Sequence, residues 1–457
     1  MLGGLPIALG ASQQLPANFD VKGIDAFLAQ QVKEREIPGM SVALVREGRV
    51  VLVKGYGKSS LARNTPVTPE TKFAIGSVTK QFTCACVLLL AEEGKLSVED
   101  KVAKYFPHLT KANEITLLDL MNHVSGYPDY YPLDFVDRRM AKPISADQLL
   151  QDYAGGRLDF EPRTRWSYSN TGYVILGLVV EKVSGESFAE FLQRRILKPL
   201  GMENTTYEPE AILDRFAQGY TSFALGPAER ALPEGKGWVA AAGALWSTPT
   251  DLAKWDMALM DGKTLNPDSY KLMTKARTLA NGRGTGYGCG VAISLRNGVT
   301  VLTHSGMVSG FSAYNSIIPA TRSAAVLLSN SEFLISPLHS RILSLMTKSE
   351  EALPKITRLS AADAARDFFA RLQQGKVDRQ QLGEEFSELL SAARLRDTAS
   401  RLRRFGRPTK VDVESLWERG GMEVADVRIA FKSGQAVKAL MYRTPDGKIQ
   451  EFLVLKE

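Results

Sequence analysis

The pattern of apolar residues predicts a helix followed by a β-hairpin near the start of the chain. Four apolar residues recur at positions i, i+3, i+4 and i+8, as on one face of a helix: Ile24, Phe27, Leu28 and Val32. Two valine-rich runs follow at residues 41–45 and 49–53, joined by a short segment that contains a glycine. Such runs on either side of a glycine turn are typical of a hairpin.

A long helical stretch separates this hairpin from further strands. Helical spacing with glycine and proline interruptions dominates from residue 81 to about residue 200. Strand patterns return at residues 299–303 and 323–329, with irregular sequence expected between them. Early and late strands that enclose a helical middle predict one α/β (α+β) unit over residues 19–348, with an all-α subdomain at roughly residues 81–235.

The pattern restarts near the C-terminus. Residues 349–359 include acidic residues and a proline and predict a linker. Beyond them, a capping motif at Ser360 opens a helical pattern, and alternating apolar residues separated by glycine turns predict an antiparallel meander. Residues 360–457 are therefore expected to form a small α+β domain, whose shape resembles the cone-like domain of the nuclear transport factor 2 superfamily.

Composition and charge narrow the functional classes. The chain has 457 residues, of which 44% are hydrophobic and 23% charged, as in an ordinary globular protein with more than one domain. The net charge of +7 is moderate and no RNA- or DNA-binding motif accompanies it, so nucleic acid is not an expected partner. No apolar stretch reaches the roughly 18 residues of a spanning helix, so no membrane span is expected.

The first 18 residues bear on where the protein acts. They begin with an apolar segment that ends in small residues and resembles the end of a secretory signal whose basic start has been removed. This resemblance favours a periplasmic or secreted bacterial protein. The alternative is a disordered start of a cytoplasmic protein.

The cysteines and histidines indicate neither a disulfide framework nor a metal site. The three cysteines are expected to be free: Cys84, Cys86 and Cys289. The four histidines do not show a metal-binding spacing: His108, His123, His304 and His339. We expect no metal and no cofactor, structural hydrogen bonds at His108 and His123, and a surface helix at His339.

One segment combines a nucleophile with a base. Ser77-Val-Thr-Lys80 precedes an apolar helical pattern, and residues three apart on a helix share one face, so the two side chains can meet. A lysine can take the proton of a serine hydroxyl when burial lowers its pKa, and residues 84–90 are apolar enough to bury it. The alternative is an ordinary helix-capping serine with a surface lysine.

Tyr168-Ser-Asn170 precedes a second apolar helical pattern. A tyrosine beside a lysine ammonium is another candidate acid or base. Asn170 can donate its amide to a substrate carbonyl and accept a hydrogen bond from Lys80. The alternative is a buried tyrosine at a helix start whose neighbour Asn170 serves as a cap.

His304-Ser305-Gly306 directly follows a predicted strand. Strand backbone at such a point can pair with a peptide-like substrate. We expect His304 and Ser305 to face one pocket. The backbone N–H of Met307 could complete an oxyanion hole with that of Ser77, whose position at a helix start leaves its amide free.

The order Ser-x-x-Lys, Tyr-x-Asn, His-x-Gly resembles that of the penicillin-recognising serine hydrolases. The similarity is greatest to the branch with class C β-lactamases, D-Ala-D-Ala carboxypeptidases, D-aminopeptidases and related family VIII-type esterases. It runs from about residue 24 to residue 328 and includes residues 120–126 and 240–248. It implies a β-lactamase-like antiparallel sheet flanked by helices.

The resemblance also implies a role for each motif. Ser77 would be the acylated nucleophile, and Lys80 and Tyr168 would transfer protons. The expected substrate contacts are residues of the other two motifs: Asn170, His304, Ser305 and Gly306. Which of Lys80 and Tyr168 is the general base stays open, as does the oligomeric state.

His304 departs from class C β-lactamases, whose third motif usually begins with lysine. A neutral histidine lacks the fixed charge that would hold a substrate carboxylate, so esters or amides without one become plausible substrates. The sequence predicts a serine hydrolase that acts on small esters, amides or β-lactams. The alternatives are a carboxypeptidase or D-aminopeptidase, an efficient β-lactamase, or a catalytically weak penicillin-binding scaffold that binds partners through the arginine-rich C-terminal domain.

Overall fold

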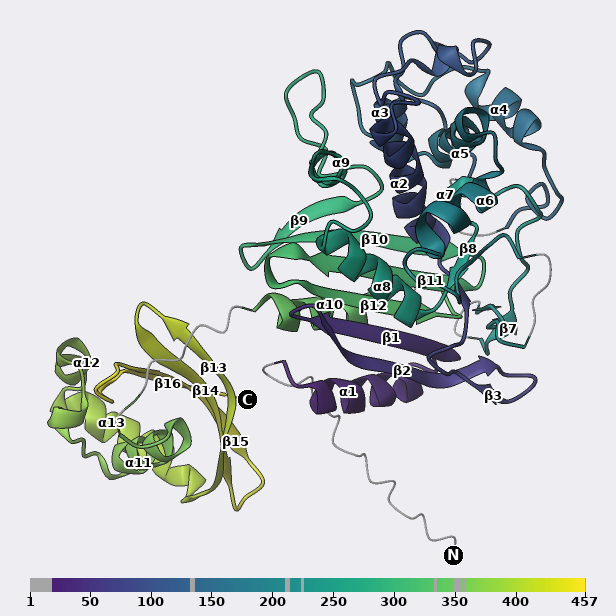
Figure 1. The fold of residues 1–457 in the computed structure, drawn as a ribbon. Coiled ribbons are helices and arrows are strands. Elements are labelled where there is room, and N and C mark those ends of the chain that lie inside the picture. Colours follow the sequence, from purple (N-terminus) through teal and green to yellow (C-terminus); the bar gives the residue numbers. More distant parts are fainter. Residues whose placement is uncertain are drawn as a thin grey trace, which may run out of the picture. The chain divides into compact units, whose positions relative to one another are not determined.

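The computed structural model divides into two compact units, one spanning Asp20–Thr347 and one that begins at Lys348 (Figure 1). The structure describes these residues: 19–131, 136–209, 214–222, 226–332, 335–348, 356 and 358–456. The predicted signal remnant at residues 1–18 lies outside them, and so does most of the predicted linker. None of the described helices is long and apolar enough to cross a membrane.

A seven-stranded antiparallel sheet forms the centre of the first unit, in the order β3-β2-β1-β12-β11-β10-β9. Its strands are β1 (Gly39–Arg46), β2 (Arg49–Ser60), β3 (Thr65–Pro66), β9 (Ala292–Arg296), β10 (Val299–Val308), β11 (Phe311–Ile318) and β12 (Ser323–Ser329). The predicted hairpin is present as β1 and β2. Strand β1 also pairs with β12, so the two ends of the unit meet in the middle of the sheet.

Two expectations for the late strands were wrong. The third motif does not follow a strand but lies on one, because β10 continues to Val308. The segment expected to be irregular contains β11. This strand carries the buried polar residues Ser312, Asn315 and Ser316, which break the apolar pattern of the sequence but form hydrogen bonds inside the protein.

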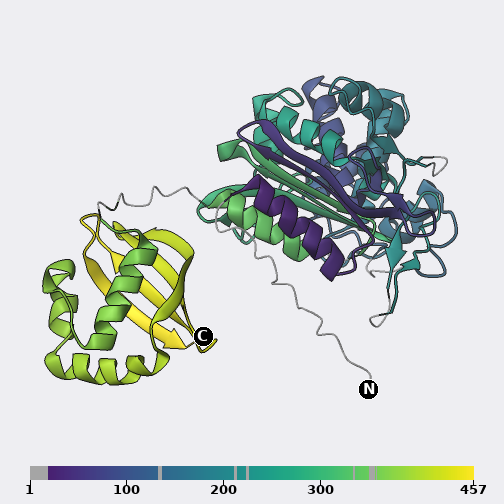
Figure 2. The ribbon, with the colours of Figure 1, turned by 90° about the horizontal axis from the view of Figure 1, so that it is seen from below.

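Helices cover both faces of the sheet. Helices α1 (Val21–Glu34) and α10 (Ser336–Thr347) lie side by side on one face (Figure 2), and α8 (Pro249–Met260) lies on the other. His339 is buried on α10, where its Nε2 atom lies 3.0 Å from the hydroxyl oxygen of Ser316. The prediction of a surface histidine was therefore wrong, because this helix packs His339 against the sheet.

The helical subdomain is built on α2 (Thr79–Glu92) and α5 (Asn170–Ser184). The shorter helices around them are α3 (Leu117–Met121), α4 (Ala146–Ala154), α6 (Phe188–Leu192) and α7 (Ala240–Gly243). Every residue of α2 from Thr79 to Leu90 is buried. Because a helix that is enclosed on all sides must bury its polar residues too, α2 carries Lys80 into the protein interior. The three cysteines are free and buried.

Short elements complete the first unit. A small sheet contains β4 (Phe73–Ala74), β8 (Leu245–Ser247) and β5 (Thr206–Tyr207), and β6 (Tyr220–Thr221) pairs with β7 (Glu229–Arg230). Helix α9 (Pro267–Met273) precedes β9. A single 3₁₀ turn, η1 (Gly76–Val78), connects β4 to α2 and holds Ser77.

The second unit has helices before strands. Helices α11 (Ala361–Gln374), α12 (Glu384–Leu389) and α13 (Ala392–Leu402) precede the meander β13 (Pro408–Arg419), β14 (Met422–Phe431), β15 (Ala436–Arg443) and β16 (Ile449–Lys456). The expected cap is present, because the Ser360 hydroxyl accepts a hydrogen bond from the Asp363 backbone N–H. The predicted fold class is confirmed: a large antiparallel sheet flanked by helices, and a separate α+β unit at the C-terminus.

Candidate active site

Ser77 and Lys80 meet at the junction of η1 and α2. The Nζ atom of Lys80 lies 3.0 Å from the Ser77 hydroxyl oxygen. It also lies 2.6 Å from Oδ1 of Asn170 and 2.8 Å from the backbone oxygen of Ala242. These three acceptors match the three protons of an ammonium group.

Burial lowers the pKa of Lys80 to about 7, although the charge of Asp129 opposes this shift. Near neutral pH, a large fraction of this lysine is therefore an uncharged amine. An uncharged amine has two protons, which can stay with Asn170 and Ala242, and one lone pair, which is then left to face Ser77. The site can thus present a base to the serine hydroxyl without changing its shape.

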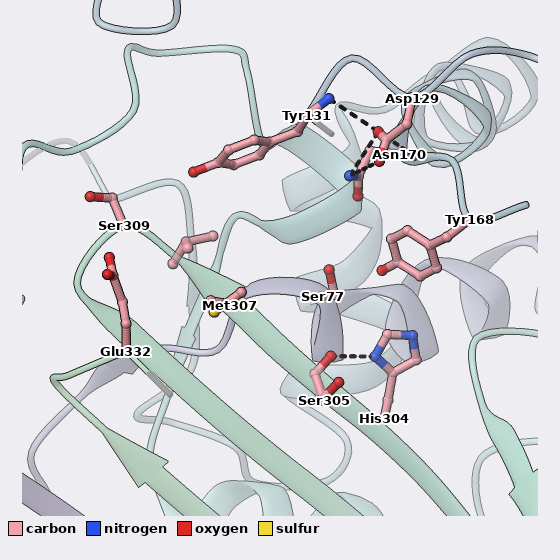
Figure 3. Close-up of a pocket in the computed structure, with 11 residues that line it drawn as sticks. Ser77, Asp129, Tyr131, Tyr168, Asn170, His304, Ser305, Met307, Ser309 and Glu332 are labelled. Atoms are coloured by element: carbon pink, nitrogen blue, oxygen red, sulfur yellow. Dashed lines mark hydrogen bonds between the residues drawn. The ribbon is translucent and has the colours of Figure 1, made fainter. Parts of the chain in front are cut away.

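Tyr168 approaches Ser77 from the segment just before α5 (Figure 3). The Tyr168 hydroxyl points towards that of Ser77 (Figure 3), and the Lys80 amine lies 4.8 Å from the centre of the Tyr168 ring. Loss of water around the phenol raises the pKa of Tyr168 well above its ordinary value. Tyr168 is therefore protonated at neutral pH, which suits it to pass protons rather than to take the first one.

Two glycines allow the backbones of η1 and β10 to come close together. A Cβ atom at Gly306 would lie 1.9 Å from the Ile75 carbonyl oxygen and 3.0 Å from the Ser77 nitrogen. A Cβ atom at Gly76, which has a φ of +49°, would lie 2.7 Å from the Met307 nitrogen. The amides of Ser77 and Met307 are thus neighbours beside the Ser77 hydroxyl, an arrangement that can bind an oxyanion.

His304 is held as a neutral ring. Its Nδ1–H donates to the Ser305 carbonyl oxygen over 2.6 Å, which leaves Nε2 to accept from the Tyr287 hydroxyl over 2.7 Å. Burial and the nearby Lys80 lower the pKa of His304 to about 3. Both ring nitrogens are occupied within the protein, so His304 forms a wall of the pocket and has no nitrogen to spare for a substrate.

The pocket in front of Ser77 has a volume of about 240 Å³. It is lined by six of the residues singled out from the sequence: Ser77, Tyr168, Asn170, His304, Ser305 and Met307 (Figure 3). Lys80 and Gly306 are the two predicted site residues that stand behind this lining, where they contact Ser77 or its backbone. The structure thus brings all the predicted site residues together.

Acidic side chains add a charge that the motifs do not reveal. Asp129 and Glu332 line the pocket, and the rest of the described lining contains no lysine or arginine. Asp129 accepts from the side-chain amide of Asn170 at 3.0 Å and from its backbone N–H at 3.1 Å. Glu332 accepts from the Gly310 backbone at 2.7 Å. Asp129 also accepts from the Tyr131 backbone N–H, and Glu332 also accepts from the Thr221 hydroxyl, so Glu332 keeps more acceptor sites for a ligand than Asp129 does. The two negative charges make the pocket favour cations over anions.

Sequence reasoning missed Asp129, Glu332 and Tyr287. Asp129 follows the family-like segment 120–126 by three positions, and this closeness is the one signal that could have drawn attention to it. Glu332 and Tyr287 belong to no motif, and the fold alone brings them to the site. His123 does make the expected structural hydrogen bond, because its Nδ1 atom accepts from the Ser169 backbone N–H over 3.1 Å.

A protein-family model described as Beta-lactamase matches residues 24–342. The chain therefore belongs to the beta-lactamase family. The protein flp of Staphylococcus aureus strain MW2 is 28% identical over 338 residues, which are 70% of this chain and 66% of that protein. This chain thus spans slightly under two thirds of the length of that relative.

Solved structures share the fold over most of this chain. D-amino acid amidase from Ochrobactrum anthropi SV3, complexed with L-phenylalanine amide, is 25% identical with a TM-score of 0.61, over 71% of this chain and 96% of that one. An octameric penicillin-binding protein homologue from Pyrococcus abyssi has a TM-score of 0.62 over 96% of this chain and 100% of that one. Its identity is 22%, so this likeness concerns the fold alone.

Proposed function

We propose that this protein is a serine hydrolase that forms an acyl-enzyme on Ser77 and acts on amides or esters of amino acids that carry a free ammonium group. The observation that carries the proposal is the charge of the pocket. Asp129 and Glu332 face a substrate, whereas the third motif contributes the neutral His304. A substrate carboxylate would meet repulsion there, and an ammonium group would meet attraction.

The choice of base follows from the two pKa shifts. Lys80 is partly uncharged at neutral pH and lies 3.0 Å from the Ser77 oxygen, whereas Tyr168 holds its proton strongly. In the proposed first half-reaction, the amine of Lys80 takes the Ser77 proton as the oxygen attacks the substrate carbonyl carbon. The amides of Ser77 and Met307 stabilise the resulting oxyanion.

Tyr168 completes the proton transfer. It donates its proton to the leaving amine or alcohol as the tetrahedral intermediate collapses, and it is reprotonated from the Lys80 ammonium. The products of this step are the Ser77 ester and the free leaving group. In the second half-reaction, Lys80 takes a proton from water, the hydroxyl attacks the ester, and Ser77 regains its proton as the acid leaves.

The similarity to a D-amino acid amidase supports the same substrate class. It also suggests the test. D- and L-phenylalanine amide would be assayed beside N-acetyl-D-phenylalanine amide, which differs in having no ammonium group. We expect turnover of one or both free amides, little turnover of the acetylated amide, and loss of all turnover in Ser77→Ala.

Two outcomes would contradict the proposal. The first is fast hydrolysis of nitrocefin, a β-lactam that carries a carboxylate, with no turnover of the amides. The second is equal hydrolysis of the acetylated and free amides. Intact-mass analysis with benzylpenicillin would distinguish a third result, a long-lived adduct without turnover, which would favour the penicillin-binding scaffold.

A further inference from the structure

The C-terminal unit contains a cavity of its own, with a volume of about 370 Å³. Helix α12, helix α13 and the edge strand β16 supply most of its lining. All the residues that line it belong to the second unit, so it is separate from the pocket in front of Ser77. The volume corresponds to about a dozen water-sized groups and falls in the range of small-molecule sites.

The interior of this cavity is apolar. Its deeper wall includes the buried side chains of Leu372, Phe386 and Phe452. Leu389 and Leu455 also line it, with exposed fractions of 53% and 54%. Large apolar side chains that are exposed around one hollow mark a binding site more often than scattered ones do. An apolar ligand in this cavity would remove them from water.

Arginines stand beside this apolar surface. Arg394, Thr398 and Arg401 occupy one face of α13, because they are separated by four and three positions, and all three line the cavity. Arg404 lines it too, with its guanidinium 4.9 Å from the centre of the Phe405 ring. The described lining holds one carboxylate, that of Glu451, against these three arginines.

The charges of these arginines are not neutralised by the part of the chain that the structure describes. Within it, Arg394 donates to the Leu389 carbonyl oxygen and Arg401 to the Thr398 hydroxyl, and none of the three arginines forms an ion pair. Guanidinium groups bind carboxylates and phosphates through paired hydrogen bonds. The cavity therefore combines an apolar interior with unneutralised anion-binding groups.

We propose that this cavity binds an anionic amphiphile, with a single acyl chain in the apolar interior and a carboxylate or phosphate headgroup at Arg394, Arg401 and Arg404. The ligand chemistry is that of a fatty acid or a single-chain lipid phosphate. A cationic amphiphile of the same length lacks the headgroup interaction and would meet three positive charges. The site is independent of the hydrolase reaction.

The first test is calorimetric titration of the full chain with dodecanoate below its micelle concentration, beside dodecyltrimethylammonium of the same chain length. We expect dodecanoate to bind one to one and the cation to bind at least tenfold more weakly. Equal binding of the two amphiphiles would overturn the proposal, and so would no heat of binding with dodecanoate.

Substitutions in and near the cavity test whether dodecanoate binds there. Arg401→Gln is expected to weaken dodecanoate binding about tenfold, since it removes a charged hydrogen-bond donor. Arg396→Gln is the matched control, because Arg396 is exposed on the same helix but does not line the cavity, and it should bind as the wild type does. Thr398→Phe fills the cavity without removing charge and should abolish binding. Hydrolase activity reports only on the first unit, so folding of the second unit in each variant is checked by circular dichroism and by a thermal unfolding transition that matches that of the wild type.

A vesicle assay separates a monomeric ligand from a membrane surface. Vesicles of phosphatidylcholine with phosphatidylglycerol would be sedimented with the wild type and with Thr398→Phe. We expect dodecanoate in solution to bind the wild type even when no vesicles are present. Binding to vesicles alone, unchanged by Thr398→Phe, would overturn the cavity proposal in favour of electrostatic attachment to a lipid surface.

Discussion

The amine of Lys80 lies 3.0 Å from the hydroxyl oxygen of Ser77, and the side chain that carries it is fully buried. Burial makes the amine acidic enough to lose its proton near neutral pH, while Asn170 and Ala242 hold it in position. The same enclosure thus sets both the distance to the nucleophile and the protonation state of the base.

The first prediction concerns pH. Because the uncharged form of Lys80 is the active one, kcat/KM should rise with pH through a pKa of about 7 and level off above it. The assay substrate is p-nitrophenyl acetate. This ester has no ammonium group, so titration of the substrate does not contribute to the pH profile. A profile that stays flat from pH 5 to pH 9, with chemistry shown to be rate-limiting, would exclude Lys80 as the base.

The second prediction concerns Asp129. Its charge raises the pKa of Lys80, so Asp129→Asn should move the rising limb of the p-nitrophenyl acetate profile to lower pH. Glu332→Gln is the matched comparison, because Glu332 lines the same pocket but is not a cause of the Lys80 shift. Glu332→Gln should raise KM for phenylalanine amide and should not move the rising limb of the p-nitrophenyl acetate profile. Equal shifts in both variants would contradict this assignment.

The third prediction separates the two proton-transfer residues. Tyr168→Phe removes the group that protonates the leaving amine, and general acid catalysis typically contributes about 10² to 10⁴ in rate. p-Nitrophenolate leaves without a proton, so the ester should lose much less activity than the amide. Lys80→Ala should lower both rates alike. An equal loss on both substrates in Tyr168→Phe would mean that Tyr168 acts before the leaving group departs.

The fourth prediction concerns Gly306. A methyl group there would meet the Ile75 carbonyl oxygen at 1.9 Å, so Gly306→Ala must push β10 away from η1 and separate the two amides of the oxyanion hole. Loss of one oxyanion donor costs about 10² to 10³ in kcat. Thr300→Ala, at an exposed position of the same strand, should keep full activity. Near-normal activity in folded Gly306→Ala would show that these amides are not used.

The fifth prediction concerns stability. Burial raises the pKa of Asp256 well above its ordinary value, and its Oδ2 atom has no hydrogen-bond partner among the residues that the structure describes. The folded protein therefore favours the protonated acid. The free energy of unfolding falls as the pH rises above the pKa that the Asp256 side chain has in the unfolded chain. Asp256→Asn replaces the acid with a neutral group of the same shape. Its Tm should exceed that of the wild type by about 2–4 °C for each 1 kcal/mol gained.

The pH dependence tests the cause of that gain. The Tm difference between Asp256→Asn and the wild type should be small near pH 4 and should grow towards pH 8, since the charged form is absent at the lower pH. Measurements by calorimetry at several pH values would show this trend. A variant that is less stable than the wild type at pH 8 would contradict it, because the charged acid would then be well accommodated.

The sequence predicted the parts of the site that follow from local spacing. Ser77 and Lys80 meet because residues three apart share a helix face, and the order of the three motifs carried a family resemblance over most of the first unit. Tyr287 and Glu332 could not be foreseen in this way. They reach the site from irregular segments far along the chain, where no period of two or 3.6 residues marks a side chain that turns inward.

The elements of the fold likewise divide into those that the sequence predicted and those that it did not. The hairpin β1–β2 and the helix α1 follow clear apolar patterns, and both are present. Strand β11 was missed because Ser312, Asn315 and Ser316 are buried through hydrogen bonds with other parts of the chain. Hydrophobicity alone cannot reveal a polar side chain whose partner is supplied by the tertiary structure.

The pairing of β1 with β12 has a consequence for biosynthesis. Met40 pairs with Ser329, so one edge of β1 has no partner until nearly the whole first unit has left the ribosome. Contacts between such distant segments slow folding, and an unpaired strand edge is a template for aggregation. Nascent chains that stop before β12 should therefore depend on chaperones, whereas chains that extend past Ser329 can close the sheet.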